Sequence, residues 1–238
     1  IEQDFKNKDL LFLGTEFSFF FSVNGGEKWI EFDKGMPDIQ VGDIAIQERE
    51  SDIVLATFGR GFYIIDDYSP LRKLTDDFVK NTDAHIFPVK DALQYIQTSK
   101  QYGQGATVWL AKNPPFGAVF SYYLKDVPKT DKQKRKEKEK ELFKNSEKIP
   151  QPTWKELEEE EKQEKTFLLF TIKDDEGKTV RKITAKPSKG LSRTAWDLTY
   201  DNPFPTKASK GKFSPFKSER SGMLALPGKY TVEMGMYE

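Results

Sequence analysis

Residues 11–15, Leu-Phe-Leu-Gly-Thr, and residues 53–57, Ile-Val-Leu-Ala-Thr, are two versions of one apolar segment, placed 42 residues apart. At the same offset, the Phe-Phe pair at residues 20–21 matches the Phe-Tyr pair at residues 62–63. A match at two places with one offset indicates that a single supersecondary unit is written twice between residues 11 and 67.

Each copy contains short runs of apolar and aromatic residues bounded by turn residues. Such runs are typical of strands that are buried on both faces. In the first copy, Asn24-Gly25 lies between two runs and is a strong hairpin signal, because both central residues of the tight turn need positive φ. The expected strands are residues 10–16, 19–23 and 28–32, then 43–46, 53–57 and 62–65.

The length of the repeat favours one architecture. Repeats of about 40 to 45 residues with several short strands are typical of β-propeller blades, and helical arrays of similar period need amphipathic helices that these segments lack. A blade needs neighbours on both sides before its apolar faces are covered. We therefore expect residues 1–100 to be the C-terminal blades of an incomplete ring, with Ile1 not a natural start. The remaining blades, in the same protein or in another chain, are the first expected partner.

The hairpin at residues 22–29, Ser-Val-Asn-Gly-Gly-Glu-Lys-Trp, resembles the Asp-box of propellers with bacterial neuraminidase repeats, Ser-x-Asp-x-Gly-x-x-Trp. Asn24 stands where that family usually has Asp. The resemblance implies a structural role: Ser22 and Asn24 hydrogen-bond the backbone of the turn, Gly26 allows the turn, and Trp29 packs between blades.

Residues 57–67, Thr-Phe-Gly-Arg-Gly-Phe-Tyr-Ile-Ile-Asp-Asp, resemble the last blade of sortilin-type and xyloglucanase-type propellers. The likeness covers about residues 9–98 and is greatest to large exported bacterial proteins that are labelled glycosyl hydrolases from these repeats alone. It implies an exported, cell-surface or periplasmic protein. Because this architecture carries hydrolases, lectins and protein receptors alike, it leaves the activity open.

Composition excludes several classes of function. The chain has 238 residues, 38 basic and 38 acidic, so its formal charge is zero and no general nucleic-acid surface is expected. It has no cysteine, which excludes disulfides, thiol chemistry and thiolate metal sites. No apolar run approaches the length of a bilayer span, so no direct membrane span is expected.

The segment after the repeats reads as a connector. Residues 69–80 are expected to form one helix, with Leu71, Leu74 and Phe78 on one face. Residues 84–96 are expected to be an outer strand of the blade, and they contain the only histidine, His85. Without a second histidine or a cysteine to share a metal, His85 is interpreted as a half-buried edge residue rather than a ligand or general base.

Residues 106–238 have a different pattern, with short strand-like runs separated by turns. Such a pattern suits an antiparallel sandwich. Three phrases in this half resemble the small immunoglobulin-like domain found in such exported propellers and in flagellar hook-cap proteins. They lie at residues 171–181, 190–198 and 226–232. The expected strands are residues 117–124, 167–173, 179–183, 191–198 and 228–236, with Trp196 as the core aromatic between the sheets.

A charged insertion, residues 126–165, separates the first two strands of this half. Residues 129–144 are mainly basic and residues 153–165 mainly acidic, and Thr153 with Glu156 forms a capping box. We expect an antiparallel helical hairpin with a small apolar contact of Phe143, Trp154 and Leu157 at its turn end. Its role is either that of a docking arm or that of a tolerated, solvated insertion.

Two loops in this half remain. Residues 173–178, Lys-Asp-Asp-Glu-Gly-Lys, are interpreted as a plain hairpin turn, because the alternating ligands of a calcium loop are missing. Residues 202–222 form a long loop whose Phe204, Phe213 and Phe216 are either a partner-binding patch or, as we favour, a seal between the domains.

No catalytic constellation is visible in the sequence. Glycoside cleavage needs two carboxylates roughly 5 to 10 Å apart, and the adjacent Asp66 and Asp67 point to opposite faces if extended. A Ser-His-Asp set, a phosphate loop and metal-ligand spacing are all missing, so we expect no catalytic residue, cofactor or metal. The segment is interpreted as non-catalytic, from a protein that binds protein or glycan partners. The alternatives are a xyloglucanase-like hydrolase with its carboxylates in the missing blades, and a structural component of a surface assembly.

Overall fold

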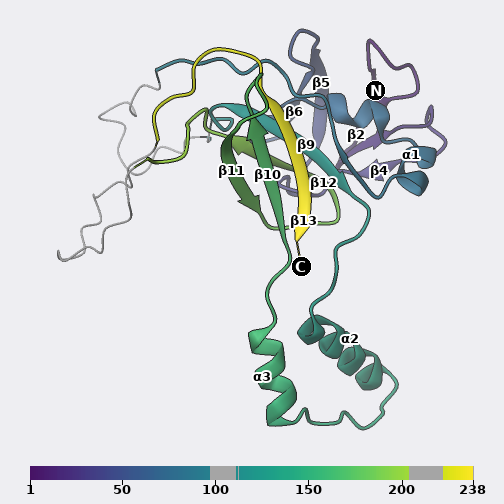
Figure 1. Cartoon of the computed structure of the whole chain (residues 1–238). Helices are drawn as coiled ribbons and strands as arrows, with labels where there is room; N and C mark the ends of the chain where they lie inside the picture. Colours follow the sequence, from purple (N-terminus) through teal and green to yellow (C-terminus); the bar gives the residue numbers. More distant parts are fainter. Residues whose placement is uncertain (97–110, 112, 204–221, 238) are drawn as a thin grey trace, which may run out of the picture. The chain divides into compact units, whose positions relative to one another are not determined.

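The computed structural model describes residues 1–96, 111, 113–203 and 222–237. It is mostly β, as predicted, with four small antiparallel sheets and few helices. The chain divides into two compact units, Ile1–Asp83 and Ala84–Glu238, which are coloured in sequence order in Figure 1. In the described part, no helix has both the length and the apolar character of a bilayer span.

The first unit holds two antiparallel sheets that follow the chain order. All six strands expected in the two copies are present. The first sheet has the order β1 (Glu2–Gln3), β2 (Leu11–Gly14), β3 (Phe19–Ser22) and β4 (Ile30–Glu31), and the second has the order β5 (Val41–Gln47), β6 (Asp52–Thr57) and β7 (Gly61–Ile65).

Strand register shows that the repeat is not uniform. Gly14 pairs with Phe19 in the first sheet, whereas Ala56, which is 42 residues after Gly14, pairs with Phe62 in the second. Phe19 therefore corresponds to Phe62, an offset of 43. The prediction of one offset throughout was wrong here, because five residues separate the paired Ala56 and Phe62, whereas four separate the equivalent pair Gly14 and Phe19. A shift of one residue turns a strand's side chains to the other face.

The two sheets pack face to face through small and apolar residues. Phe12 and Phe19 of the first sheet and Ile53 and Leu55 of the second are all buried. A Cβ on Gly14 would lie only 2.8 Å from Val41 Cγ1, so glycine is what allows the closest approach. The first sheet thus packs with the side that carries Phe12 and Phe19, and the second sheet packs with its opposite side, which carries Ile53 and Leu55.

The connector after β7 differs from the single helix that was predicted. A 3₁₀ helix, η1 (Ser69–Lys73), is followed by a separate helix, α1 (Asp76–Asn81). Thr75 interrupts the helical run because its side chain caps α1 by accepting a hydrogen bond from the Phe78 N–H, which requires extended backbone at Thr75.

The second unit contains two three-stranded sheets around one core. The predicted strands of this half are present, and their apolar side chains from both sheets meet in one cluster. One sheet has the order β12 (Gly190–Trp196), β9 (Ala118–Leu124), β8 (Ala84–Ile86), and the other the order β11 (Thr179–Ala185), β10 (Phe167–Lys173), β13 (Thr231–Tyr237).

Strand β8 corrects the expectation for residues 84–96. Only Ala84–Ile86 is a strand, and it pairs with β9 rather than with a strand of the first unit. It is therefore not an outer strand of the second repeat. The expected boundary at residues 99–105, most of the long loop and its three phenylalanines lie outside the described residues.

The charged insertion forms the expected pair of helices, α2 (Asp131–Lys144) and α3 (Trp154–Lys162). Capping boxes at Thr130 and Thr153 start them, and Arg135 joins them through two hydrogen bonds to Glu160, of 2.6 and 2.9 Å.

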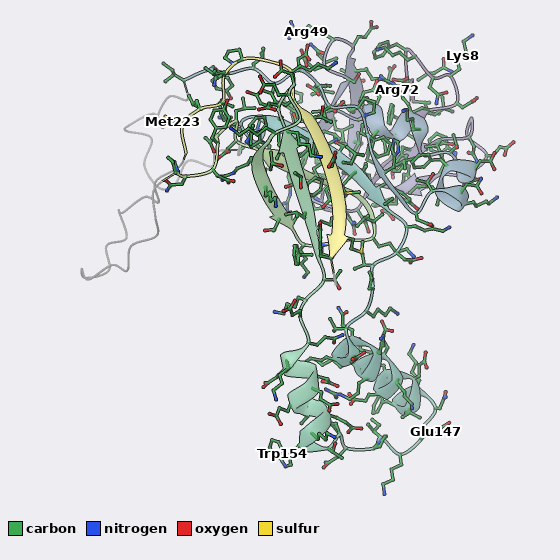
Figure 2. The ribbon with its side chains drawn as sticks, viewed as in Figure 1. Lys8, Arg49, Arg72, Glu147, Trp154 and Met223 are labelled. Carbon is green, nitrogen blue, oxygen red and sulfur yellow. The ribbon has the colours of Figure 1, made fainter. Side chains whose placement is uncertain are left out.

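The expected apolar contact at the turn end of this hairpin is missing. Phe143 and Trp154 are 75% and 89% exposed. Figure 2 shows Trp154 where α3 begins, at the turn end of the hairpin. In the described part, the hydrogen bonds that join the helices lie toward the opposite end, where the Asp131 N–H also donates to Gln163. The ion pair and hydrogen bonds toward that end therefore join the two helices.

Candidate functional site

The hairpin at residues 22–29 is held by its own side chains. Ser22 is fully buried, and its Oγ accepts a hydrogen bond of 2.9 Å from the Gly26 N–H. The Asn24 Oδ1 accepts from Ser22 Oγ and from the Lys28 N–H, each at 2.9 Å. Gly26 has a φ of 96°, which disfavours any other residue there. The oxygen of the Asn24 side-chain amide thus holds the turn.

Trp29 follows this turn and is half-buried. A Cβ built on Gly26 would lie 3.7 Å from the Trp29 ring and 3.5 Å from Leu11. The Trp29 indole therefore lies beside the turn, near the side chain of Leu11 in β2.

A buried polar cluster, not anticipated from the sequence, joins the two repeats. Asp4, in the loop after β1, is only 3% exposed and forms a two-armed pair with Arg72 of η1, with N–O distances of 2.8 and 2.9 Å. The Tyr68 hydroxyl donates to the same carboxylate at 2.5 Å, and Arg72 also reaches the Ser51 hydroxyl at 3.1 Å. We call Asp4, Ser51, Tyr68 and Arg72 the clamp; Figure 2 labels Arg72.

The charges and polar groups of the clamp satisfy one another. Burial by itself would raise the pKa of Asp4, but hydrogen bonds from Arg72, Tyr68 and the Asn7 N–H outweigh burial and leave this pKa below its ordinary value. Burial, together with the hydrogen bond to Asp4, raises the pKa of the Tyr68 hydroxyl. At neutral pH the cluster therefore consists of the Asp4 carboxylate, the Arg72 guanidinium ion and the neutral phenol of Tyr68. Their contacts link the segment before β2 to the segment after β7.

The outward side of the second sheet carries an uncovered apolar patch, with Asp43, Gln47 and Asp52 on the same face beside it. By strand alternation and register, Ala45, Val54, Ala56, Phe62 and Ile64 share one face. Phe62 and Ile64 are 73% and 61% exposed. We call these five residues the open face. Fully burying a Val, Ile or Phe side chain stabilises a protein by about 1.5 to 3 kcal/mol, so covering this face would lower the free energy.

The open face corresponds to a face that is covered in the first sheet. Phe62 is the counterpart of Phe19, which is 1% exposed because it lies on the side of the first sheet that packs against the second. Val54 and Ala56 are likewise the counterparts of Phe12 and Gly14. The same side is thus buried in one repeat and exposed in the next.

The other singled-out residues have structural surroundings. His85 is half-buried in the edge strand β8, beside Phe87 at 5.0 Å between ring centroids. Asp67 adopts positive φ and accepts a hydrogen bond from Ser69, which assigns it to a turn. Asp174 caps the hairpin at residues 173–178 by accepting from the Lys178 N–H, as the interpretation of a plain turn requires. The described residues contain no group of three or more His, Asp or Glu placed to hold a metal ion.

Trp196 is a core residue, as predicted. It is 2% exposed, its indole N–H donates to the Thr199 carbonyl at 2.8 Å, and its ring meets Tyr230 edge-on at 5.0 Å between centroids. It forms part of the wall of a hollow of about 660 Å³ in the second unit, but its polar atom is already engaged. The residue therefore belongs to the packing of the two sheets.

The sequence missed the clamp because its members have no local pattern. Asp4 is 64 residues from Tyr68 and 68 residues from Arg72 in the sequence.

Comparison of the chain with protein-family models, with curated proteins and with solved structures finds no match in any of the three.

Proposed function

We propose that residues 1–83 are two consecutive blades of a β-propeller and that the second unit is an immunoglobulin-like β-sandwich with a helical insertion. We further propose that the chain is a non-catalytic segment of an exported or cell-surface protein that binds protein or glycan partners. The observation that carries this proposal is the equivalence of Phe19, which is buried, and Phe62, which is exposed.

In a propeller, each blade packs one face on the preceding blade and the other on the following blade. The second sheet has two apolar faces, one against the first sheet and one uncovered. Its open face is the counterpart of the side by which the first sheet packs, so a further sheet of the same kind fits there. The remaining blades are therefore the proposed partner of the open face.

The second unit supports the sandwich part of the proposal. Its two three-stranded antiparallel sheets share a core in which Phe120 of β9 stacks near Phe170 of β10, with 5.9 Å between ring centroids. A buried tryptophan in that core is a common feature of immunoglobulin-like sandwiches.

The proposal that this segment is itself non-catalytic is supported by the structural roles of its singled-out acidic groups. The buried carboxylate, Asp4, is saturated by Arg72 and Tyr68, and Asp67 and Asp174 hold turns. A glycoside hydrolase needs one carboxylate free to protonate or attack across the scissile bond. Propeller proteins that only bind their partners use the rim loops of the ring, which these two blades help to build.

The test uses protein made from the complete reading frame, incubated with xyloglucan and with other soluble β-glucans. We expect no time-dependent release of reducing ends. Retention on an immobilised glucan would identify a glycan partner, and capture of a specific protein without glucan retention would identify a protein partner. Release of reducing ends in proportion to protein and time would instead show the xyloglucanase-like alternative, and failure to bind any glycan or protein would leave the purely structural role.

A further inference from the structure

The second sheet lacks the fourth strand that the first sheet has. In the first sheet, β4 lies beside β3 and pairs Ile30 with Phe21. In the second sheet, β7 is the edge strand. The residues at the place equivalent to β4, residues 72–74, lie in and just after η1, where Arg72 is held by the clamp. The chain therefore leaves the place beside β7 open within the described residues.

The direction of the backbone groups on β7 follows from the equivalent strand. The Phe19 carbonyl accepts from the Phe32 N–H at 2.9 Å, so Phe19 directs its backbone groups away from β2. Its counterpart is Phe62. The Gly61 carbonyl, one residue earlier, accepts from the Thr57 hydroxyl and so points toward β6. Because alternate residues of a strand direct their backbone groups to the same side, Phe62 and Ile64 present N–H and C=O groups at the free edge.

An edge of this kind is a template for another strand. Unpaired backbone groups on an exposed apolar strand readily recruit an extended segment. In the described part of the chain, no charged side chain lies within β7 to discourage such pairing. In the first sheet, the equivalent edge is covered by the antiparallel strand β4. This strand places Ile30 opposite Phe21, which is the counterpart of Ile64.

We propose that the free edge of β7 takes a fourth, antiparallel strand from the polypeptide that also supplies the sheet on the open face. This inference rests on the proposed function, since it assumes that the two sheets are copies of one blade. The incoming strand has an apolar residue opposite Ile64 and a polar one opposite Tyr63, as Ile30 and Glu31 stand opposite Phe21 and Phe20. It donates a backbone N–H to the Phe62 carbonyl.

The first experiment measures amide exchange in the isotope-labelled chain of residues 1–238 by NMR, in dilute solution. We expect the N–H groups of Phe62 and Ile64 to exchange about tenfold or more faster than those of Tyr63 and Ile65, which bond to β6. Slow exchange at all four positions would overturn the proposal. If that protection depended on protein concentration, the edge would be occupied by a second copy of the chain, and if it did not, by another part of the same chain.

The second experiment supplies a strand. The probe is a synthetic peptide of residues 27–34, Glu-Lys-Trp-Ile-Glu-Phe-Asp-Lys, which contains β4. At roughly millimolar peptide, as expected for so short a ligand, we expect chemical-shift changes centred on β7 and slower exchange at Phe62 and Ile64. The control peptide carries Phe32→Pro, which removes the N–H that would meet the Phe62 carbonyl, and we expect it to have no effect. Equal effects of both peptides, or changes centred on other strands, would overturn the proposal.

A variant separates this inference from the proposed function. Phe62→Ala removes the largest side chain of the open face but leaves the backbone of the edge in place. We expect this variant still to bind the peptide of residues 27–34. Peptide binding by the variant together with failure of the complete protein to place a sheet on the open face would mean that the edge of β7 accepts a strand, but that the blade proposal and the source of the strand proposed here are both wrong. An occupied open face without any strand on β7 would mean that only the present inference is wrong.

Discussion

Among single residues, Asp4 links the start of the first unit to the segment after β7. Its carboxylate is buried with the guanidinium group of Arg72, and both oxygens are engaged. A buried ion pair repays the cost of leaving water only when its geometry is good and its remaining hydrogen-bonding positions are filled, which is the case here. Removing one member leaves the other charged, buried and unpaired.

We predict that Asp4→Asn lowers the free energy of unfolding of the first unit by about 3 to 5 kcal/mol. Hydrogen exchange of β6 amides reports this unit separately from the second. The matched control is Arg49→Ala, because Arg49 pairs with Glu50 at the surface, with side chains 81% and 47% exposed, and such pairs contribute about 0 to 1 kcal/mol. Equal, small effects of the two substitutions would show that the clamp does not stabilise the unit.

The clamp also predicts a pH dependence. The pKa of Asp4 is lower in the folded chain than its ordinary value of 3.8, so its contribution to stability is present above that value and is lost as pH falls through the folded pKa. We expect the stability of the first unit to fall more steeply in the wild type than in Asp4→Asn between about pH 5 and pH 2. Chemical denaturation at a series of pH values measures this slope. Parallel profiles would contradict the role given to Asp4.

At the level of elements, the spacing of the two sheets depends on a glycine. Gly14 ends β2 directly against Val41, which begins β5. Gly42, the next residue along β5, has only the Ala56 carbonyl nearby, at 3.9 Å from a built Cβ. Packing therefore requires a glycine at residue 14 but not at residue 42.

We predict that Gly14→Ala destabilises the first unit by about 1 to 3 kcal/mol, because the added methyl group overlaps Val41. Gly42→Ala should be neutral or stabilising by about 0.5 to 1 kcal/mol, since alanine loses less backbone entropy on folding. Thermal unfolding followed by circular dichroism compares the two variants. Similar losses in both would place the close approach elsewhere.

The hairpin of α2 and α3 is an element held mainly by charge. Arg135 bonds both Glu139 of its own helix and Glu160 of α3. Arg135→Gln should therefore speed amide exchange in both helices and leave the strands of the second unit unchanged. Lys134→Gln, which removes only an exposed contact to Asp131, is the control and should have little effect. Added salt should speed exchange in the wild-type helices in the same direction.

For the molecule as a whole, the main feature is that one face is repeated in two different environments. Phe19 and Phe62 are the same residue at the same place in two consecutive sheets, one covered and the other exposed. The loss of stability when either phenylalanine is changed to alanine therefore shows whether a neighbouring sheet covers it. This difference, rather than the composition of either sheet, is the basis for proposing further blades.

We predict that Phe19→Ala destabilises the first unit by about 3 to 5 kcal/mol, whereas Phe62→Ala changes its stability by no more than about 0.5 kcal/mol. Urea titration with β6 exchange as the readout distinguishes them. In protein made from the complete reading frame, Phe62→Ala should become costly as well, because a neighbouring sheet would then cover it. A large loss for Phe62→Ala in the chain of residues 1–238 would mean that the open face is already covered there.

The sequence by itself determined most of the strands, the turn at residues 22–29 and the two helices of the charged insertion, because alternation, Asn-Gly turns and capping boxes act over a few neighbouring residues. The strand expected at residues 84–96 and the single helix expected at residues 69–80 were predicted with the wrong extent. The apolar pattern also indicated Trp196 as a core residue, whereas the turn roles of Ser22 and Asn24 came from the resemblance to the Asp-box. Only the tertiary structure decided the offset of 43 in the second hairpin, the pairing of β8 with β9, and the clamp. These depend on contacts between residues far apart in the chain, and on which faces have neighbours. Two phenylalanines in equivalent strands carry no local sign of which one is buried.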